Sequence, residues 1–495
     1  MLHLNKVNVM SLHTLESRIR TELEYLDFPP RTWVRPLEGP GEAFDVVIVG
    51  GGQSGLAAAF GLLREKVKNI VVLDRAAQGR EGVWSNFARM TTLRTHKQAS
   101  GLDFGMPSLT PQAWYTAQYG EAAWQAVSKI PRDVWHRYLL WYRQVLGLPV
   151  RNSAHVVRLR PHDALLEVEL ADGERMLARK VILATGLDGG GRWYVPSVAE
   201  ALPKRFYAHT EEAIDFAALK GKRIGVLGAG ASAFDNAATA LEQGASSVDL
   251  CLRLARLPRV NPNKWLEFPG FLGHYNDLDD ATRWRFMRQL GRMNQPPPQE
   301  TLWRCTSHAN FRLRTGTPWT GASAAGDSVQ VRTPSGTLTY DFLIFGTGIV
   351  NDLDARTELT GIAPLIARWA DRYVPPEGDE DESLAAAPYL GRGFQFLEKV
   401  PGSAPWLRNV HGFNFGATTS QGLSAASISG MKYGVRRLID AVTRDLFVED
   451  AAWHLGELSR YAAQEITSYS PGLDISDWER DTAAARNLQE TVKLS

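Results

Sequence analysis

The sequence predicts an α/β protein with two Rossmann-like dinucleotide-binding domains, the second inserted in the first, each with a small β-meander. Three observations predict this fold class. An apolar strand, a glycine loop and a helix follow one another twice, with the loops at Gly50 and Gly228. Short strands with alternating polarity follow each of these units. The strands end in x-Thr-Gly both times, at Ala184-Thr185-Gly186 and at Gly346-Thr347-Gly348.

The first unit is the strongest motif in the chain. Its β-branched run, Val46–Val49, suits a strand that is buried on both faces of a parallel sheet. Gly50, Gly52 and Gly55 follow at G-x-G-x-x-G spacing, and the strand after the next helix ends in Asp74. These glycines permit a tight turn, the approach of a pyrophosphate and close helix–strand packing, while the helix presents free N–H groups. Because a carboxylate can accept hydrogen bonds from a ribose diol, the unit predicts a dinucleotide with free ribose hydroxyls.

The second unit differs at the residue that selects the dinucleotide. The strand 223–227 leads into a G-x-G-x-x-A loop at Gly228, Gly230 and Ala233, and Arg253 stands where the first unit has Asp74. A guanidinium binds a 2′-phosphate in a bidentate fork, whereas a carboxylate would repel it. The pattern therefore predicts NADPH, with NADH as the alternative if Arg253 is only a solvated charge at a strand end.

A chain of 495 residues is too long for a single core. Apolar residues at helical spacing over 12–26, before a group of prolines, predict a helix that packs on the surface of the first domain. The glycines at 189–191 with Pro196 predict the hinge between the domains. The expected parts are an N-terminal helical extension (1–40), a first dinucleotide-binding domain (41–200 and 345–445), a second one (201–344) and a C-terminal helical tail (446–495).

Other segments have clear periodicity. Trp135, Tyr138, Leu139 and Tyr142 share one face of a predicted helix, and we interpret this aromatic stripe as core rather than as a cofactor contact. Residues 254–310 read as an insertion with helices over 280–293 and 299–305. The meanders are expected over 156–159, 165–170 and 176–183, and over 328–332 and 337–345. A long helix over 424–442, with Ser420 and Gln421 at its start, would point its positive end at the first domain.

Composition excludes several function classes. The net charge is +1, which argues against nucleic acid and acidic membranes as partners. No apolar run is long enough to span a bilayer, and the N-terminus lacks the apolar core of a signal peptide. The two cysteines, Cys251 and Cys305, form no C-x-x-C motif, which fits a cytoplasmic protein without a dithiol redox centre. The sequence predicts no metal site.

These motifs resemble the class B flavoprotein monooxygenases, a group that includes flavin-containing, Baeyer–Villiger and N-hydroxylating enzymes. The resemblance rests on the two glycine loops, the two x-Thr-Gly segments and Gly82-Val83-Trp84, and it covers roughly residues 44 to 440. It implies FAD at the first loop and NADPH at the second. The cofactor-binding residues that it suggests are Gly50, Gly52, Gln53, Ser54, Gly55, Asp74, Arg75, Trp84, Val157, Thr185, Gly186, Gly228, Gly230, Ser232, Ala233, Arg253, Gly348 and Gln421.

The resemblance also suggests where the chemistry occurs. Thr95-His96-Lys97 stands where flavin-containing monooxygenases have a Thr-Asn pair beside the flavin. Our candidate catalytic residues in this region are Arg94, His96 and Lys97. The F-x-G-x-x-x-H signature of Baeyer–Villiger enzymes is degraded to Phe206-Tyr207-Ala208-His209, which disfavours that reaction. The region around Arg94 and the segment at Trp114 are also similar to bacterial flavin enzymes that hydroxylate urate or amino nitrogen.

The resemblance implies a monooxygenase that uses NAD(P)H and O2 and transfers one oxygen atom from a C4a-peroxyflavin to a small organic substrate. Two alternatives stay open: an NADPH-dependent flavin oxidase or reductase without a stable peroxyflavin, and a non-catalytic nucleotide-sensing protein. A disulfide reductase is disfavoured because it needs a dithiol pair. A homo-oligomer is compatible with the sequence.

Overall fold

The structure is a computed structural model that describes residues 11–28, 31–37, 43–425, 427–466, 468–470, 473–474, 476–477, 479–480 and 482–483. It divides into two compact units, one up to Asp445 and one from Leu446 on. The second unit holds the end of helix α13 (Ile428–Glu449), helix α14 (Ala451–Arg460) and an antiparallel pair of short strands, β18 (Ser468–Ser470) and β19 (Leu473–Asp474).

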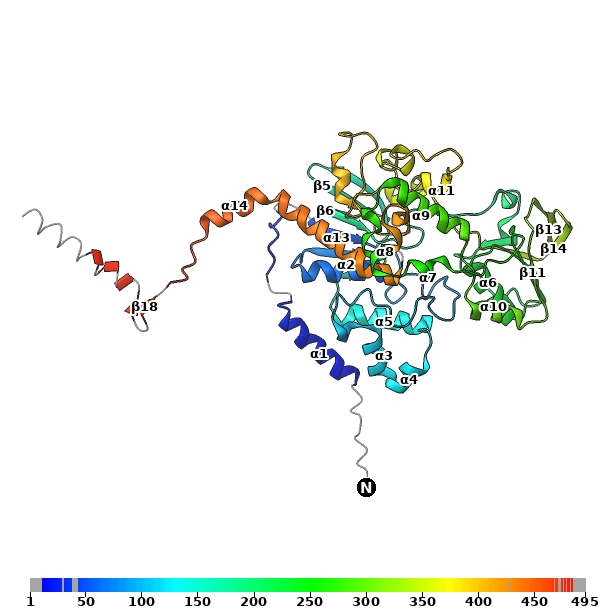
Figure 1. Cartoon of the computed structure of the whole chain (residues 1–495), viewed down its shortest axis with the longest axis horizontal. Coiled ribbons are helices and arrows are strands. Elements are labelled where there is room, and N and C mark those ends of the chain that lie inside the picture. The colour runs from blue at the N-terminus through cyan, green and yellow to red at the C-terminus, as the bar shows by residue number, and fades with distance from the viewer. Residues whose placement is uncertain are drawn as a thin grey trace, which may run out of the picture. The chain divides into compact units, whose positions relative to one another are not determined.

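The first unit is built on two main sheets (Figure 1). The larger sheet has the strand order β3-β2-β1-β6-β5-β4. In addition, β17 pairs with the carboxyl-terminal part of β6, at Val181 and Ile182. Strands β1, β2, β3, β6 and β17 are parallel, whereas β4, β5 and β6 form an antiparallel meander. The strands are β1 (Ala43–Val49), β2 (Ile70–Leu73), β3 (Val150–Arg151), β4 (Val156–His162), β5 (Leu165–Leu170), β6 (Arg175–Leu183) and β17 (Val410–His411).

The second main sheet is entirely parallel, with the order β11-β10-β9-β15-β8. A three-stranded antiparallel meander, β12-β13-β14, accompanies it. One face of the parallel sheet packs on α6, which in turn contacts α10 (Figure 1). The strands are β8 (Tyr207–His209), β9 (Arg223–Leu227), β10 (Ser247–Cys251), β11 (Phe311–Arg314), β12 (Gly321–Ala325), β13 (Ser328–Thr333), β14 (Gly336–Tyr340) and β15 (Phe342–Phe345).

Two short strands join the sheets. β7 (Gly191–Trp193) precedes the second sheet in the chain and β16 (Ile349–Asn351) follows it, and the two pair antiparallel. All strands of the second sheet therefore come from the stretch between these two connections. Short 3-10 helices link many of the other elements. The α-helices of the first unit that lie wholly within it are α1 (Leu12–Tyr25), α2 (Gln53–Arg64), α3 (Pro111–Tyr119), α4 (Glu121–Ala126), α5 (Arg132–Val145), α6 (Ala231–Glu242), α7 (Pro262–Leu266), α8 (Pro269–His274), α9 (Asp280–Met293), α10 (Gln299–Thr306), α11 (Glu382–Ala385) and α12 (Thr418–Gln421).

The predicted fold class is confirmed, and so is the core role of the aromatic stripe. Trp135, Tyr138 and Tyr142 on α5 are almost fully buried. The hydroxyl of Tyr138 donates to the Leu109 carbonyl at 2.7 Å, and that of Tyr142 donates to the Leu102 carbonyl at 2.6 Å. Both polar ends are therefore satisfied inside the core, as a buried tyrosine requires.

Two predicted elements were wrong in detail. The single strand expected over 337–345 is two strands, because the chain turns at Asp341 between β14 in the meander and β15 in the parallel sheet. The long helix begins at Ile428 instead of Ser424, and Ser420 and Gln421 lie in the separate short helix α12. Gly422 ends α12 with a φ of 69°, a left-handed conformation that interrupts a helix.

Candidate dinucleotide-binding sites

Both glycine turns lie at the carboxyl ends of parallel strands. In the first sheet Val49 pairs with Leu73 on one side and with Leu183 on the other, so Gly50, Asp74 and Ala184 leave the sheet side by side. From β1 the chain runs first to β2 on one side and later crosses to β6 on the other side, which makes this edge a topological switch point. Ligands of open α/β sheets bind in the crevice at such points.

The first turn fits a dinucleotide because it has no room for side chains. Gly50 has a φ of 109°, and a Cβ there would lie well under 3.0 Å from the Ala184 carbonyl. A Cβ on Gly55 would collide in the same way with the Gly50 carbonyl. Gly52 is the N-cap of α2 and offers no side-chain cap, so the amides of the first turn, at Gln53 and Ser54, are free of such a bond. Such an uncapped N-terminus is suited to a phosphate.

Asp74 is fixed beside this turn. Its carboxylate accepts hydrogen bonds from the amides of Gly51 and Ala76, both at 2.7 Å. Burial raises the pKa of Asp74, and these two backbone bonds act in the opposite direction. A carboxylate has about four lone-pair positions, so capacity remains for the hydroxyls of a ribose.

Other predicted residues of the first site lie around this edge. The indole N–H of Trp135 donates to the Gln53 side chain at 3.3 Å, and the ring of Trp84 packs edge-on against Trp135 with centroids 6.3 Å apart. Arg75 is exposed, and Val157 is half-buried on β4.

The other predicted parts of this site, Thr185-Gly186 and Gln421, are held by hydrogen bonds to neighbouring segments. Thr185 accepts a hydrogen bond from the Asn414 amide at 3.2 Å, and Gly186 follows with a φ of 79°. Gln421 is buried, and its amide donates to the Gly391 carbonyl at 2.7 Å. The Ser54 hydroxyl lies 3.5 Å from the Ala425 carbonyl, which brings the segment before α13 against the first turn of α2.

The second turn repeats the first. Gly228 has a φ of 150°, and a Cβ there would lie well under 3.0 Å from the Gly346 carbonyl, just as Gly50 meets Ala184. Gly346 in turn packs directly on the buried Ala233. Gly230 is the N-cap residue of α6, and no side chain caps this helix end. No atom lies within 4 Å of the place where a Cβ on Gly230 would be, and Ser232 is exposed in the first turn.

Arg253 and Gly348 flank the second turn. The pairing of Leu227 with Cys251 places Arg253 two residues beyond the end of β10, at the same edge as the glycine turn. Its side chain is exposed and has no ion-pair partner among the described residues. Gly348 has a φ of 84°, and its carbonyl accepts a hydrogen bond from the Tyr194 amide at 2.9 Å.

The structure separates the three candidate catalytic residues. Arg94 reaches across to α6, where its guanidinium lies 3.2 Å from the Asp235 carboxylate. The ring of His96 is exposed, without a hydrogen-bond partner among the described residues. The Lys97 ammonium donates to the Trp124 carbonyl at 2.6 Å and lies 4.9 Å from the centre of that ring, so it is engaged by α4. Of these three described residues, Arg94 is the one with an ion pair to the second dinucleotide-binding region.

Asp235 is a residue that sequence reasoning missed. It is buried on α6 and also accepts from Thr301 at 3.1 Å and from Arg304 at 3.3 Å, both on α10. Burial raises the pKa of Asp235, while Arg94, Thr301 and Arg304 oppose this shift. No sequence pattern identifies this network, because its partners are distant in the chain.

The insertion also contributes to the first site. Tyr275 donates to the Thr419 carbonyl at 3.0 Å, and Arg283 donates to the Ser420 carbonyl, also at 3.0 Å. A cluster of Leu266, Phe271, Leu272, Tyr275 and Met287 packs against Leu423 and Tyr433. Helices α7–α9 therefore close on the segment that leads into α13.

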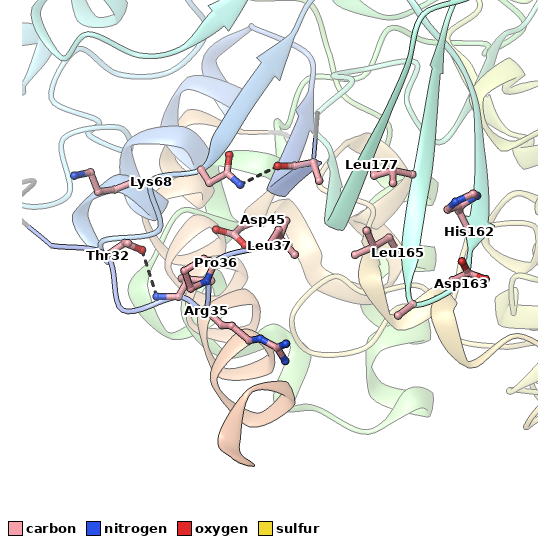
Figure 2. Close-up of a pocket in the computed structure, with 14 residues that line it drawn as sticks. Thr32, Arg35, Pro36, Leu37, Asp45, Lys68, His162, Asp163, Leu165 and Leu177 are labelled. Carbon is pink, nitrogen blue, oxygen red and sulfur yellow. Dashed lines mark hydrogen bonds between the residues drawn. The ribbon is translucent and has the colours of Figure 1, made fainter. Parts of the chain in front are cut away.

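A pocket of about 770 Å³ lies elsewhere in the first unit (Figure 2). Its lining includes Thr32, Arg35, Asp45, Lys68 and Leu177, around the amino ends of β1 and β6. The glycine turns lie at the carboxyl ends of these strands. The pocket is therefore at the opposite edge of the sheet from the dinucleotide site and takes no part in it.

Three further observations concern metal ligands, membrane-spanning helices and thiols in the described part of the chain. Among the described residues, no group of three histidine, cysteine or acidic side chains is arranged to hold a metal ion. In the same part of the chain, no helix is both long and apolar enough to cross a membrane. Cys251 and Cys305 are both buried and free, so they do not provide the dithiol of a disulfide reductase.

Comparison with known proteins agrees with this geometry. A family model described as pyridine nucleotide-disulphide oxidoreductase matches residues 47–267. The FAD-dependent urate hydroxylase of Xanthomonas campestris pv. campestris is 47% identical over 445 residues, which cover 89% of this chain and 94% of the relative.

Two solved structures of other proteins are similar to this chain in fold. The ornithine hydroxylase of Pseudomonas aeruginosa has a TM-score of 0.62 at 17% identity and is matched over 82% of this chain and 100% of its own. The L-lysine 6-monooxygenase of Pseudomonas syringae has a TM-score of 0.63 at 19% identity and is matched over 81% of this chain and 99% of its own.

The glycine turn is testable by adding one methyl group. Gly55→Ala should weaken dinucleotide binding at the first turn by a factor of about 100 or more, because the new Cβ would displace the Gly50 carbonyl. The flavin absorbance of the purified protein, relative to its protein absorbance, measures this. Gly291→Ala is the control, since no atom lies within 4 Å of a Cβ at that helical position. Normal flavin content in Gly55→Ala would contradict the assignment.

Proposed function

Because the chain belongs to the class B flavoprotein monooxygenases, we propose that it uses FAD and NADPH to hydroxylate urate or a closely related small heteroaromatic compound. The identity to a urate hydroxylase extends over 89% of this chain and 94% of that relative, so it includes both dinucleotide sites and the insertion within the second region. The likeness to the ornithine and lysine hydroxylases is below 20% identity and concerns the fold. Urate is therefore favoured over an amino nitrogen as the substrate.

One structural observation supports this function above the others. The two glycine turns are alike in geometry, but the neighbouring strand ends in a carboxylate at the first and is followed by a guanidinium at the second. Asp74 suits the free ribose diol of FAD, and Arg253 suits the 2′-phosphate of NADPH. A chain with one site of each kind can accept electrons from a nicotinamide and pass them to a flavin.

The helices and side chains around the two sites would have separate roles. The first turns of α2 and α6 would bind the two pyrophosphates, and Arg94 would hold α6 against the first domain. Helices α7–α9 would exclude water and bound the substrate next to the segment before α13. FAD held at the first site would supply the redox chemistry for transferring one oxygen atom of O2 to the substrate, with the electrons coming from NADPH and the second oxygen atom leaving as water. His96 and Lys97 stay candidates for binding the substrate or moving a proton.

The proposed setting is the reducing cytoplasm, which suits two buried free thiols. O2 and a small molecule are the expected partners.

The reaction is tested with the purified holoenzyme in air. Urate should stimulate NADPH oxidation, and O2 consumption should match hydroxylated product with little hydrogen peroxide, because productive transfer consumes the activated oxygen. Ornithine and lysine serve as comparison substrates. Stoichiometric peroxide with every substrate would instead identify the NADPH oxidase alternative.

Arg253 tests the choice of nicotinamide. Arg253→Ala should weaken NADP+ binding about tenfold to a hundredfold and leave NAD+ binding almost unchanged, because only NADP+ carries the 2′-phosphate. Calorimetric titration of both nucleotides measures this. Arg312→Ala removes an equally exposed arginine from β11 of the same sheet and should change neither affinity. Equal loss for both nucleotides in Arg253→Ala would rule out phosphate recognition.

Arg94 is proposed as a positioning residue between the two sites. Arg94→Met should slow reduction of the flavin by NADPH about tenfold while NADP+ affinity changes little, because α6 would lose its link to the first domain. Anaerobic stopped-flow absorbance gives the rate and its NADPH dependence separately. Arg94→Lys should restore part of the rate through the same carboxylate. An unchanged reduction rate in Arg94→Met would contradict this role.

A further inference from the structure

Arg437 carries a charge that its surroundings do not neutralise. It lies half-buried on α13, and its guanidinium donates to three neutral acceptors: the Gly273 carbonyl at 2.9 Å, the Ser424 hydroxyl at 3.0 Å and the Gln421 side chain at 3.3 Å. Its Nε is buried and has no hydrogen-bond partner. Among the described residues no carboxylate is within ion-pair distance of it. Burial lowers the pKa of Arg437 to about 10, so the group stays positively charged at neutral pH.

The charge is held beside the segment that precedes α13, through Gln421 and Ser424. Side chains on a helix lean towards its N-terminus, and Arg437 accordingly reaches back to the residues that precede α13. The helix and this segment are in close contact, since a Cβ on Gly434 would collide with the Ser424 carbonyl. The same segment continues to Ala425, whose carbonyl lies beside Ser54 in the first turn of α2.

The dipole of α13 adds to the positive charge of Arg437. The N-terminus of this 22-residue helix carries a partial positive charge, and the Arg437 guanidinium lies at that end. Two carboxylates of the insertion oppose it. Glu267 accepts a hydrogen bond from Ser429 at 3.1 Å, and Asp277, which lies 3.5 Å from the exposed Arg392, favours the charged form of Arg437.

We propose that Arg437 tunes the flavin: its uncompensated positive charge, held by Gln421 and Ser424, raises the reduction potential of FAD bound to this chain. The inference rests on the proposed binding of FAD at the first site. Reduction adds negative charge to the flavin around N1 and C2=O, and a nearby cation in a poorly solvated place stabilises the charged, reduced form. Arg437 is thus a positioning residue for the segment and a source of charge for the cofactor.

The test measures the midpoint potential of the FAD in purified holoenzyme by reductive titration against a reference dye. Arg437→Gln should shift the equilibrium towards oxidised flavin about tenfold, which equals about 30 mV for a two-electron couple. Arg437→Lys keeps the charge and should keep the potential. Arg436→Gln is the matched control, because it removes the same charge from the exposed neighbouring residue on the same helix.

The opposite change gives an independent check. Asp277→Asn removes a partly exposed carboxylate outside the cradle and should raise the potential. Equal shifts in Arg437→Gln and Arg437→Lys would overturn the inference, because they would trace the effect to lost hydrogen bonds. If Arg437→Gln does not retain FAD, an unchanged potential in Asp277→Asn would overturn it as well. A wild-type protein that takes up no FAD would instead refute the proposed function.

Discussion

The packing of each glycine turn against the end of a neighbouring strand is the constraint on which the other features depend. At Gly50 and again at Gly228, the turn lies so close to a carbonyl of the x-Thr-Gly segment that no side chain fits between them. This contact fixes where the chain leaves the sheet and which way the next helix points. The position of the uncapped N-terminus follows from it, and so does the place where a pyrophosphate can bind. The residues proposed to select the dinucleotide, Asp74 and Arg253, lie one strand away.

Polar contacts between distant segments hold the two sheets together. Arg94 pairs with Asp235 on α6, and Arg283 from the insertion donates to Ser420 beside α13. The Arg283 guanidinium also lies 5.0 Å from the centre of the buried Trp369 ring. These contacts use buried or half-buried charges whose partners come from distant parts of the sequence. Such charges are costly to leave unpaired, so they favour one arrangement of the two regions over others.

The sequence predicted what depends on local pattern and failed where tertiary contacts decide. The glycine turns and the aromatic stripe of α5 were predictable because their spacing directly reflects a turn or a helix face. The division of 337–345 at Asp341 was not, since the apolar residues on both sides read as one strand while they belong to different sheets. Asp341 itself accepts a hydrogen bond from the Arg223 amide at 2.7 Å, a contact across more than a hundred residues.

The site residues show the same limit. Arg94 was selected from a loose match of motifs, and its partner Asp235 had no signal of its own in the sequence. Arg437 was not selected at all, because an arginine on an amphipathic helix is indistinguishable in sequence from an exposed one such as Arg436. Lys97 stands one residue after His96, yet its ammonium is directed to α4. Which of two adjacent polar side chains faces a site depends on backbone direction, which no residue pattern encodes.

The pairing of β7 with β16 has a mechanical consequence. Both connections between the sheets are hydrogen-bonded to each other, and Gly191 packs on the Val350 carbonyl where any side chain would collide. The glycines at 189–191, which were predicted to form the hinge between the domains, are buried, and Gly191 is the first residue of β7. The two sheets are therefore linked by two hydrogen-bonded strands in place of one single connection. A large displacement of one sheet relative to the other would have to break this pairing or carry both strands along.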